Sequence, residues 1–223
     1  TRLDDLVRLN QTLGQEAQSL SRALSGDNRS QGYWGELKLE RLLETAGLEK
    51  GRDYLTQESF KDGEGDRYRP DAVLRLPEDK SIVIDAKMVL LDYQRACEAA
   101  DEAEREQAFA RHVLALRSHV KELGDKDYIR LEGLTSPDMV LMFVPVEAAF
   151  LEALRRDPQL YAYAFERKII LVGPSNLLAS LRLVAQIWRT EHQNANAKAI
   201  SDRAAVLYDK FVGFSEDLLK VGD

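Results

Sequence analysis

The chain has 223 residues, of which 31 are Lys or Arg and 38 are Asp or Glu, so its formal net charge at pH 7 is -7. This length suits one large domain, or a domain with an appendage, and can bury a substantial core. The acidic balance excludes a surface that is basic all over, so a nucleic-acid partner would need a local basic patch or a bound metal ion.

The single cysteine, Cys97, excludes internal disulfides and zinc sites built on paired cysteines. No apolar run reaches about 18 residues, and no signal-peptide pattern opens the chain. We therefore expect no membrane contact within these residues and a reducing, cytoplasmic location. The first residue is threonine rather than methionine, so we expect a fragment of a longer protein.

A 3-4 spacing of apolar side chains over residues 1–24 predicts the end of a coiled-coil helix. The a and d positions are Leu3, Leu6, Asn10, Leu13, Ala17, Leu20 and Leu24. Asn10 stands at an a position, where a buried amide can fix register and oligomer state. The pattern predicts a homo-oligomer formed through this segment. An amphipathic helix docked on its own domain explains it equally well.

The remaining residues, 25–223, alternate between helix and strand signals. The polar stretch 25–32 is expected to break the first helix, and a second helix is expected from Tyr33 to Ala46, ending at Gly47. The further elements expected are a strand at 54–60, a loop at 61–69, a hairpin at 69–87, a helix at 90–123, a strand at 138–145, helices at 147–167 broken at Pro158, a strand at 168–172 and a long helix from 175 to about 220, with a bend allowed near Gly213. This order predicts an α/β fold, a mixed sheet flanked by helices.

The hairpin, RPDAVLRLPEDKSIVIDAK, carries the candidate site. In its two arms the even-numbered positions are apolar, whereas the odd-numbered ones include Asp71, Asp85 and Lys87. Because side chains alternate between the faces of a strand, one face is expected to pack into a core and the other to be mixed and charged. A loop of three or five residues places Asp71 opposite Asp85 or Lys87, whereas a four-residue loop separates them unless a bulge restores the register.

Two carboxylates and a lysine gathered in this way suit metal-dependent cleavage of a phosphodiester. Asp71 and Asp85 can chelate Mg²⁺ or Mn²⁺, of which Mg²⁺ accepts few protein ligands and retains several waters. The metal polarises the phosphate and lowers the pKa of a bound water. Lys87, about 7 Å along the strand from Asp85, can orient that water or stabilise charge in the transition state. A hairpin end with solvated charges is the alternative, and it is disfavoured because Asp85 directly follows the apolar run SIVI.

A third carboxylate is expected from the helix at 33–46, where Glu36 and Glu40 lie one turn apart on one face. The adjacent Tyr33 and Trp34 are expected to hold the start of this helix against the sheet. Two exposed helix charges are the alternative.

Arginine and glutamine side chains mark two candidate DNA contacts. Arg67 and Arg69 lie next to the expected site in the sequence. The long last helix carries a polar stripe at spacings of 4, 3 and 4, formed by Arg182, Gln186, Arg189 and Gln193. Such side chains suit phosphate and sugar contacts. A solvated helix face is the alternative for the stripe.

The spacing of these motifs resembles the PD-(D/E)xK nuclease superfamily, because RPD is followed by DAK fourteen residues later, after a helix containing GE and LLETAG. More closely, the chain resembles the RmuC family of bacterial DNA recombination proteins. The stretches that carry this resemblance lie between Gly32 and Phe214 and are GYWGELKLERLLETAGL, RPDAVLRLPEDKSIVIDAKMVLLDYQR, SPDMVLMFVPVEAAF, LVGPSNLLASLRLVAQIWR and AISDRAAVLYDKFVGF.

The resemblance implies an α-β-β-β-α-β nuclease core, a coiled coil upstream that is anchored to the inner membrane, and a role in DNA recombination that limits rearrangements at inverted repeats. It implies that Asp71, Asp85 and Lys87 form the catalytic triad. It also implies that Glu36, rather than Glu40, is the helix glutamate and joins the two aspartates as a metal ligand.

Three functions remain open on the sequence. The first is a deoxyribonuclease that depends on Mg²⁺ or Mn²⁺. The second is a catalytically silent DNA-binding or scaffolding module that protects structured DNA, because the superfamily includes members that bind without cleaving. The third is an oligomerisation protein in which the coiled coil matters more than any site.

Overall fold

The computed structural model describes residues 28–61, 67–77, 79–88, 90–126 and 139–221. The predicted coiled-coil segment, residues 1–24, lies outside the described residues. The chain divides into two compact units, Thr1–Leu183 and Val184–Asp223, and the candidate site lies in the first.

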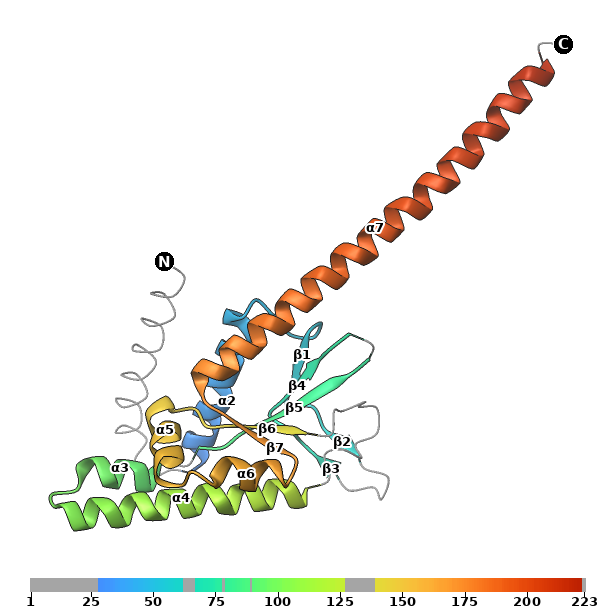
Figure 1. Ribbon diagram of the computed structural model, residues 1–223. Coiled ribbons are helices and arrows are strands. Elements are labelled where there is room, and N and C mark those ends of the chain that lie inside the picture. Colours follow the sequence, from blue (N-terminus) through green and yellow to red (C-terminus); the bar gives the residue numbers. More distant parts are fainter. Residues whose placement is uncertain (1–27, 62–66, 78, 89, 127–138, 222–223) are drawn as a thin grey trace, which may run out of the picture. The chain divides into compact units, whose positions relative to one another are not determined.

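A five-stranded mixed sheet forms the centre of the first unit, in the order β1-β4-β5-β6-β7 (Figure 1). The antiparallel part consists of β1 (Tyr54–Thr56), β4 (Ala72–Arg75) and β5 (Ser81–Ala86). The strands β6 (Val140–Phe143) and β7 (Ile169–Val172) continue the sheet parallel to β5. Parallel neighbours need long crossover connections, and helices fill them here. The predicted α/β class with a mixed sheet flanked by helices is therefore confirmed.

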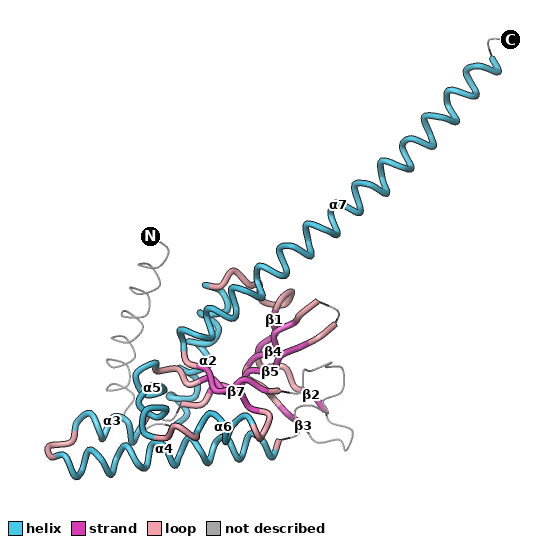
Figure 2. The backbone as a smooth tube through the Cα atoms, viewed as in Figure 1, coloured by secondary structure: helices cyan, strands magenta, loops and turns pink. Residues whose placement is uncertain are grey.

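Helices lie on both faces of this sheet (Figures 1 and 2). They are α2 (Asn28–Thr45), α3 (Leu91–Glu98), α4 (Glu102–Asp125), α5 (Glu147–Arg156) and α6 (Leu160–Phe165). On one face, Leu116, Val120 and Leu123 of α4 share a hydrophobic core with Val73 and Val83 of the hairpin. Helix α2 packs against β5. Burial of this kind stabilises by roughly 25 cal/mol for each Å² of apolar surface removed from water.

The odd-numbered face of the β4–β5 hairpin is more deeply buried than its sequence pattern predicted. Val73 and Val83 are 1% and 0% exposed, as deeply buried as Leu74 and Ile84 on the even-numbered face. This face is mixed and charged as predicted, with Ser81 and Asp85 beside the two valines, but it is buried because helices cover both faces of the sheet. The site charges therefore stand at the border of a core, where desolvation raises the cost of each ionised group.

Three predicted elements differ in their bounds. Helix α2 begins at Asn28, so the described part of the 25–32 stretch is helical rather than broken. The strand predicted at 54–60 is divided between β1 and the short β2 (Phe60–Lys61), which pairs with β3 (Arg67–Tyr68). The helix predicted at 90–123 is divided into α3 and α4. Asp101 caps α4 by accepting a hydrogen bond from the Glu104 N–H at 2.7 Å, the Asp-x-x-Glu pattern of a helix start.

The predicted end of helix α2 at Gly47 is confirmed. Gly47 has φ +90, and the Leu48 N–H donates to the Leu43 carbonyl at 3.2 Å. This is the geometry in which a left-handed glycine closes a helix, and a residue with a Cβ adopts it at a cost.

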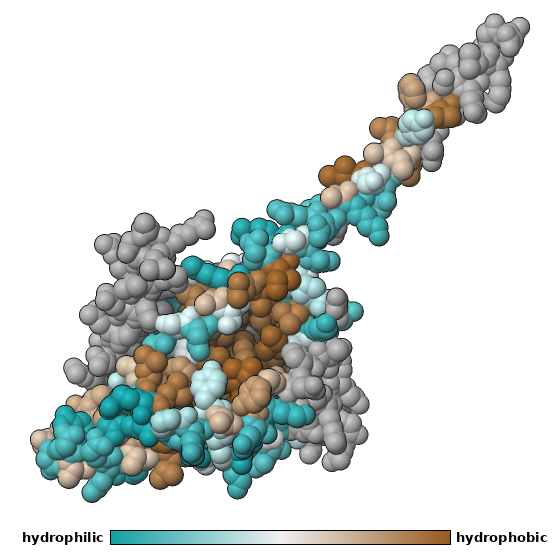
Figure 3. Space-filling model, in the orientation of Figure 1, coloured by the Kyte–Doolittle hydropathy of each residue, from teal (hydrophilic) through white to brown (hydrophobic). Residues whose placement is uncertain are grey.

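The long last helix, α7 (Pro174–Val221), is confirmed and continues through Gly213. Its first turns belong to the first unit and bury Leu177 and Leu181. In the second unit, Ile200, Leu207 and Phe211 are 67%, 69% and 68% exposed. Brown, apolar atoms are visible at the surface of this part of the helix in Figure 3. Within the described part of the chain, no helix combines the length and apolar character needed to cross a membrane.

Candidate functional site

The turn of the β4–β5 hairpin determines which side chains meet. The Leu76 N–H donates to the Lys80 carbonyl at 2.7 Å, which leaves a three-residue loop ending in Asp79 at φ +57. A three-residue loop whose last residue is left-handed is a common hairpin connection. Arg75 pairs with Ser81, so odd-numbered positions pair with odd-numbered ones, as the three-residue alternative required.

The same register brings Asp71 opposite Asp85 at the open end of the hairpin. Asp71 Oδ2 accepts a hydrogen bond from the Ala86 N–H at 2.7 Å, which ties the entry of β4 to the exit of β5. Asp85 is 3% exposed, and its Oδ2 lies 2.9 Å from Lys87 Nζ. The structure thus brings together Asp71, Asp85 and Lys87, the three residues that the sequence pattern grouped.

Burial and mutual repulsion make Asp71 a weak acid. Its pKa rises to about 6, first because of burial and then because of the negative charges of Asp85 and Glu36, although the Ala86 hydrogen bond and Lys87 oppose the rise. For Lys87, burial lowers the pKa, but the carboxylates around it, Asp85 first, together outweigh burial and the net shift is upward. Lys87 is therefore charged at neutral pH. Two crowded carboxylates with one ammonium retain a net attraction for a cation.

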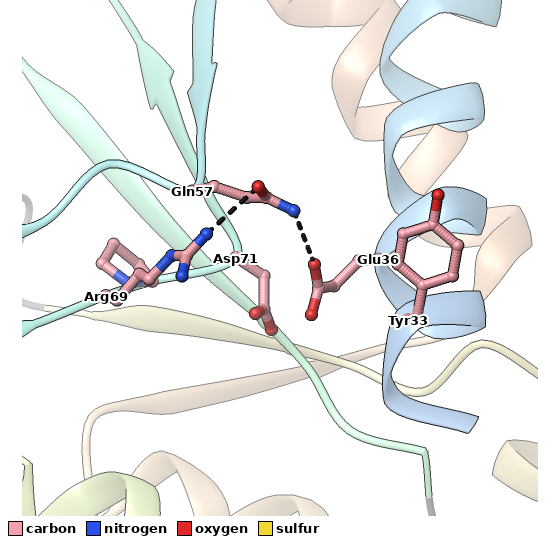
Figure 4. Close-up of a pocket in the computed structure, with 6 residues that line it drawn as sticks. Tyr33, Glu36, Gln57, Arg69 and Asp71 are labelled. Carbon is pink, nitrogen blue, oxygen red and sulfur yellow. Dashed lines mark hydrogen bonds between the residues drawn. The ribbon is translucent and has the colours of Figure 1, made fainter. Parts of the chain in front are cut away.

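A pocket of about 310 Å³ opens beside Asp71 (Figure 4). Its lining residues come from α2 and from the ends of β1 and β3, and they are Tyr33, Glu36, Gln57, Arg69, Pro70 and Asp71. Gln57 Nε2 donates to Glu36 Oε2 at 3.2 Å, and Gln57 Oε1 accepts from Arg69 Nη2 at 3.1 Å. The pocket therefore joins the helix carboxylate, an arginine and the first site aspartate.

The two candidate helix glutamates have different surroundings. Glu36 lines the pocket, whereas Glu40 Oε1 accepts a hydrogen bond from Lys50 Nζ at 2.6 Å in an ion pair. Glu36 is thus the helix carboxylate that faces Asp71, and its negative charge contributes to the raised pKa of that residue.

Asp71, Asp85 and Glu36 offer enough carboxyl groups for a divalent cation, but their side chains are not arranged around a common point as the predicted three-ligand site requires. Among the described residues, no three or more His, Cys, Asp and Glu side chains are arranged to hold a metal ion. Asp71, Asp85 and Glu36 therefore do not form a ready-made set of ligands in this structure. Mg²⁺ commonly takes only one or two carboxylates and keeps its waters, so Asp71 and Asp85 suffice for it chemically.

The candidate DNA contacts are distributed over both units. Arg69 is exposed at the pocket, and Arg67 lies in β3 just before it. The stripe of Arg182, Gln186, Arg189 and Gln193 is exposed along α7, with Arg182 in the first unit and the other three in the second. None of these four is among the residues that line the pocket.

Two features of the pocket were missed or misassigned from the sequence. Tyr33 is 60% exposed at the pocket, so the prediction that it anchors α2 is wrong, and Trp34 alone packs inward, beside Leu90 and Val146. No sequence pattern marked Gln57 as a residue of the site. Its position depends on a left-handed backbone, φ +60, directly after β1.

Fold and site together define an α/β protein that presents two aspartates and a lysine at the end of a hairpin, beside a helix glutamate. The family model of the RmuC family matches residues 1–223. The chain belongs to the RmuC family.

The relatives include proteins from several bacteria. The chain is 54% identical over 220 residues to the DNA recombination protein RmuC homolog of Pseudomonas aeruginosa, covering 99% of this chain and 48% of the relative. It is 48% identical over 220 residues to the RmuC homolog of Vibrio cholerae, covering 99% of this chain and 43% of the relative. It is 48% identical over 218 residues to the DNA recombination protein RmuC of Escherichia coli K12, covering 98% of this chain and 46% of the relative.

The chain thus spans less than half the length of these curated relatives. No solved structure matches it.

Proposed function

We propose that this chain is the nuclease domain of a DNA recombination protein and that it hydrolyses DNA phosphodiester bonds with a PD-(D/E)xK site. The observation that carries the proposal is the meeting of Asp71, Asp85 and Lys87 at the end of one hairpin, with Glu36 facing them from α2. The names of the relatives support the recombination role. DNA as the substrate implies that the domain acts on the cytoplasmic side.

In this proposal Asp71 and Asp85 hold Mg²⁺ or Mn²⁺, with Glu36 as the third carboxylate. The bound metal supplies Lewis acidity at the phosphate and an acidified water. Asp85 keeps Lys87 protonated beside it, so the ammonium can hold the attacking water or donate to a phosphate oxygen. Arg69, which is exposed at the pocket, and Arg67, two residues before it in the chain, would neutralise phosphates that flank the scissile bond.

A cleavage assay on single-stranded, duplex and branched DNA, with Mg²⁺ and with Mn²⁺, tests the proposal. We expect cleavage by the parent chain and its loss in Asp85→Asn and Lys87→Met. Glu40→Gln is a matched control, because Glu40 lies on the same face of α2 as Glu36 but pairs with Lys50. This control is expected to cleave as the parent does. Equal cleavage by Asp85→Asn and the parent, with contaminating nuclease excluded, would refute the site.

A catalytically silent module that binds and protects structured DNA is the second candidate. The observation that favours it is the 2.9 Å ion pair between Asp85 Oδ2 and Lys87 Nζ, because the lysine already compensates a carboxylate that a metal ion would otherwise hold. This function predicts DNA binding of the parent chain with no cleavage in either metal. It also predicts that Asp85→Asn changes neither the affinity for DNA nor the protection of the bound DNA from an added nuclease.

A further inference from the structure

Gln57 has a backbone conformation that its residue type disfavours. Its φ is +60, in the left-handed region, where a residue with a Cβ is uncommon unless it is Asn or Asp. Asp79, at φ +57, is explained by the hairpin loop that it closes. Gln57 has no such local reason, since glutamine is not a turn-forming residue. Backbone strain of this kind persists where the surrounding contacts hold it, and it is frequent at functional sites.

The side-chain amide of Gln57 donates one hydrogen bond and accepts another. Its Nε2 donates to Glu36 Oε2 at 3.2 Å and its Oε1 accepts from Arg69 Nη2 at 3.1 Å. Figure 4 shows the amide between the carboxylate and the guanidinium, with Asp71 beside them. Only a side chain that both donates and accepts can serve these two partners. A glutamate would repel Glu36, and a lysine could not accept from Arg69.

We propose that Gln57 is a positioning residue that acts as a neutral spacer between Glu36 and Arg69. Opposite charges so placed attract each other, and a direct ion pair would satisfy both groups at once. The intervening amide holds each by a single hydrogen bond, so that Glu36 keeps negative charge for a divalent cation and Arg69 keeps positive charge for a DNA phosphate. This inference rests on the proposed function of the same site.

The inference explains why the strained conformation is retained. A glycine at position 57 would adopt the left-handed backbone without strain but would lose the amide. Alanine would keep the strain and also lose the amide. Comparing Gln57→Gly with Gln57→Ala therefore separates the effect of backbone strain from that of the lost amide. The two variants are expected to differ in thermal stability but to lose metal affinity alike.

The test is a calorimetric titration of the DNA-free chain with Mn²⁺, combined with thermal unfolding of the metal-free chain. Both variants are expected to bind Mn²⁺ about three- to tenfold more weakly, the loss that the net contribution of one ordinary hydrogen bond implies. Metal-free Gln57→Gly is expected to unfold at a higher temperature than metal-free Gln57→Ala, and no lower than the parent. In a Glu36→Gln background, replacing Gln57 is expected to cause no further loss of Mn²⁺ affinity.

A second titration, of the metal-free chain with duplex DNA, tests whether Gln57 keeps the charge of Arg69 available for a phosphate. Both Gln57 variants are expected to bind DNA more weakly than the parent, and Glu36→Gln is expected to restore the binding, because it removes the competing charge. Gln57 variants that bind Mn²⁺ as the parent does would overturn the spacer while leaving the proposed function intact. A Gln57→Gly variant that binds Mn²⁺ more weakly and also unfolds at a lower temperature than the parent would show a purely structural role. A parent chain that binds no Mn²⁺ would overturn the proposed function and the inference with it.

Discussion

At the scale of single residues, the site is defined by how its charges are desolvated. Asp85 follows a buried strand and is itself buried, yet Lys87 lies beside it and compensates its charge. Asp71 lacks such close compensation by a cation and becomes a weak acid, with a pKa of about 6. A buried carboxylate that repels another carboxylate costs free energy in the apo protein. A divalent cation would relieve that cost.

The first prediction concerns Asp85. Asp85→Asn removes a carboxylate and a charge that repels phosphate, so cleavage is expected to be abolished while DNA affinity stays equal or rises. Gel-shift titration and a cleavage time course on the same DNA measure the two effects separately. Loss of both binding and cleavage would indicate misfolding, which circular dichroism would detect.

The second prediction concerns pH. Because the pKa of Asp71 is about 6 in the folded chain and 3.8 ordinarily, the folded state binds the proton more tightly. The free energy of unfolding should therefore fall as pH rises from about 4 to about 6, by up to about 3 kcal/mol from this group. Urea unfolding of the metal-free chain across this range measures it. Asp71→Asn is expected to lose this part of the slope, and parallel curves for the two proteins would contradict the assignment.

At the scale of elements, the site depends on how strand and helix ends are joined. The hairpin loop pairs odd with odd positions and so brings Asp71 to Asp85. Close packing also fixes the backbone where β7 joins α7. A Cβ on Gly173 would lie 2.7 Å from Phe150 Cδ1, and Glu147 Oε2 accepts from the Ser175 N–H at 2.8 Å. This junction holds the start of α7 against α5.

The third prediction tests that junction. Gly173→Ala forces the Phe150 ring to move in a packed core, so we expect a loss of about 1–3 kcal/mol in the free energy of unfolding. Gly32→Ala is the matched control, because nothing lies within 4 Å of a Cβ at that position of α2. Since alanine favours a helix over glycine by about 1 kcal/mol, the control is expected to be neutral or stabilising. Equal denaturation midpoints for the two variants would contradict the junction argument.

At the scale of the whole molecule, a chain with a net charge of -7 would hold DNA, its proposed substrate, through small local patches. Association of several copies would let such patches act together, since linked weak contacts gain effective concentration. The heptads at residues 1–24 predict such association, and they lie outside the described residues. In the second unit, Ile200, Leu207 and Phe211 are exposed apolar side chains that also suit a packed partner.

The fourth prediction concerns assembly. Deleting residues 1–24 is expected to lower the oligomer order without unfolding the five-stranded sheet, which has its own core. DNA affinity should weaken more than cleavage at saturating DNA. Light scattering and a binding titration on the truncated chain measure both. A truncated chain that remains fully oligomeric would place association elsewhere, and a monomer with unchanged DNA affinity would exclude avidity.

The sequence by itself determined the features that depend on local spacing. Gly47 ends α2 because its left-handed conformation is available locally, and the alternation around Asp71 and Asp85 requires a common side of the hairpin once the loop has three residues. The family also followed from contiguous motifs. The capping pattern at Asp101 was local too, so the division of α3 from α4 could have been predicted.

Only the tertiary structure decided the rest, because burial and charge neighbours arise from segments far apart in the chain. Val73 and Val83 are buried because α4 covers their face, which no alternation of residues within the hairpin reveals. Glu36 lines the pocket, whereas Glu40 pairs with Lys50, 10 residues away from it along the chain. Gln57 meets Glu36 and Arg69 only when α2, β1 and β3 come together, and a bridge made by three separate segments has no local pattern to predict it.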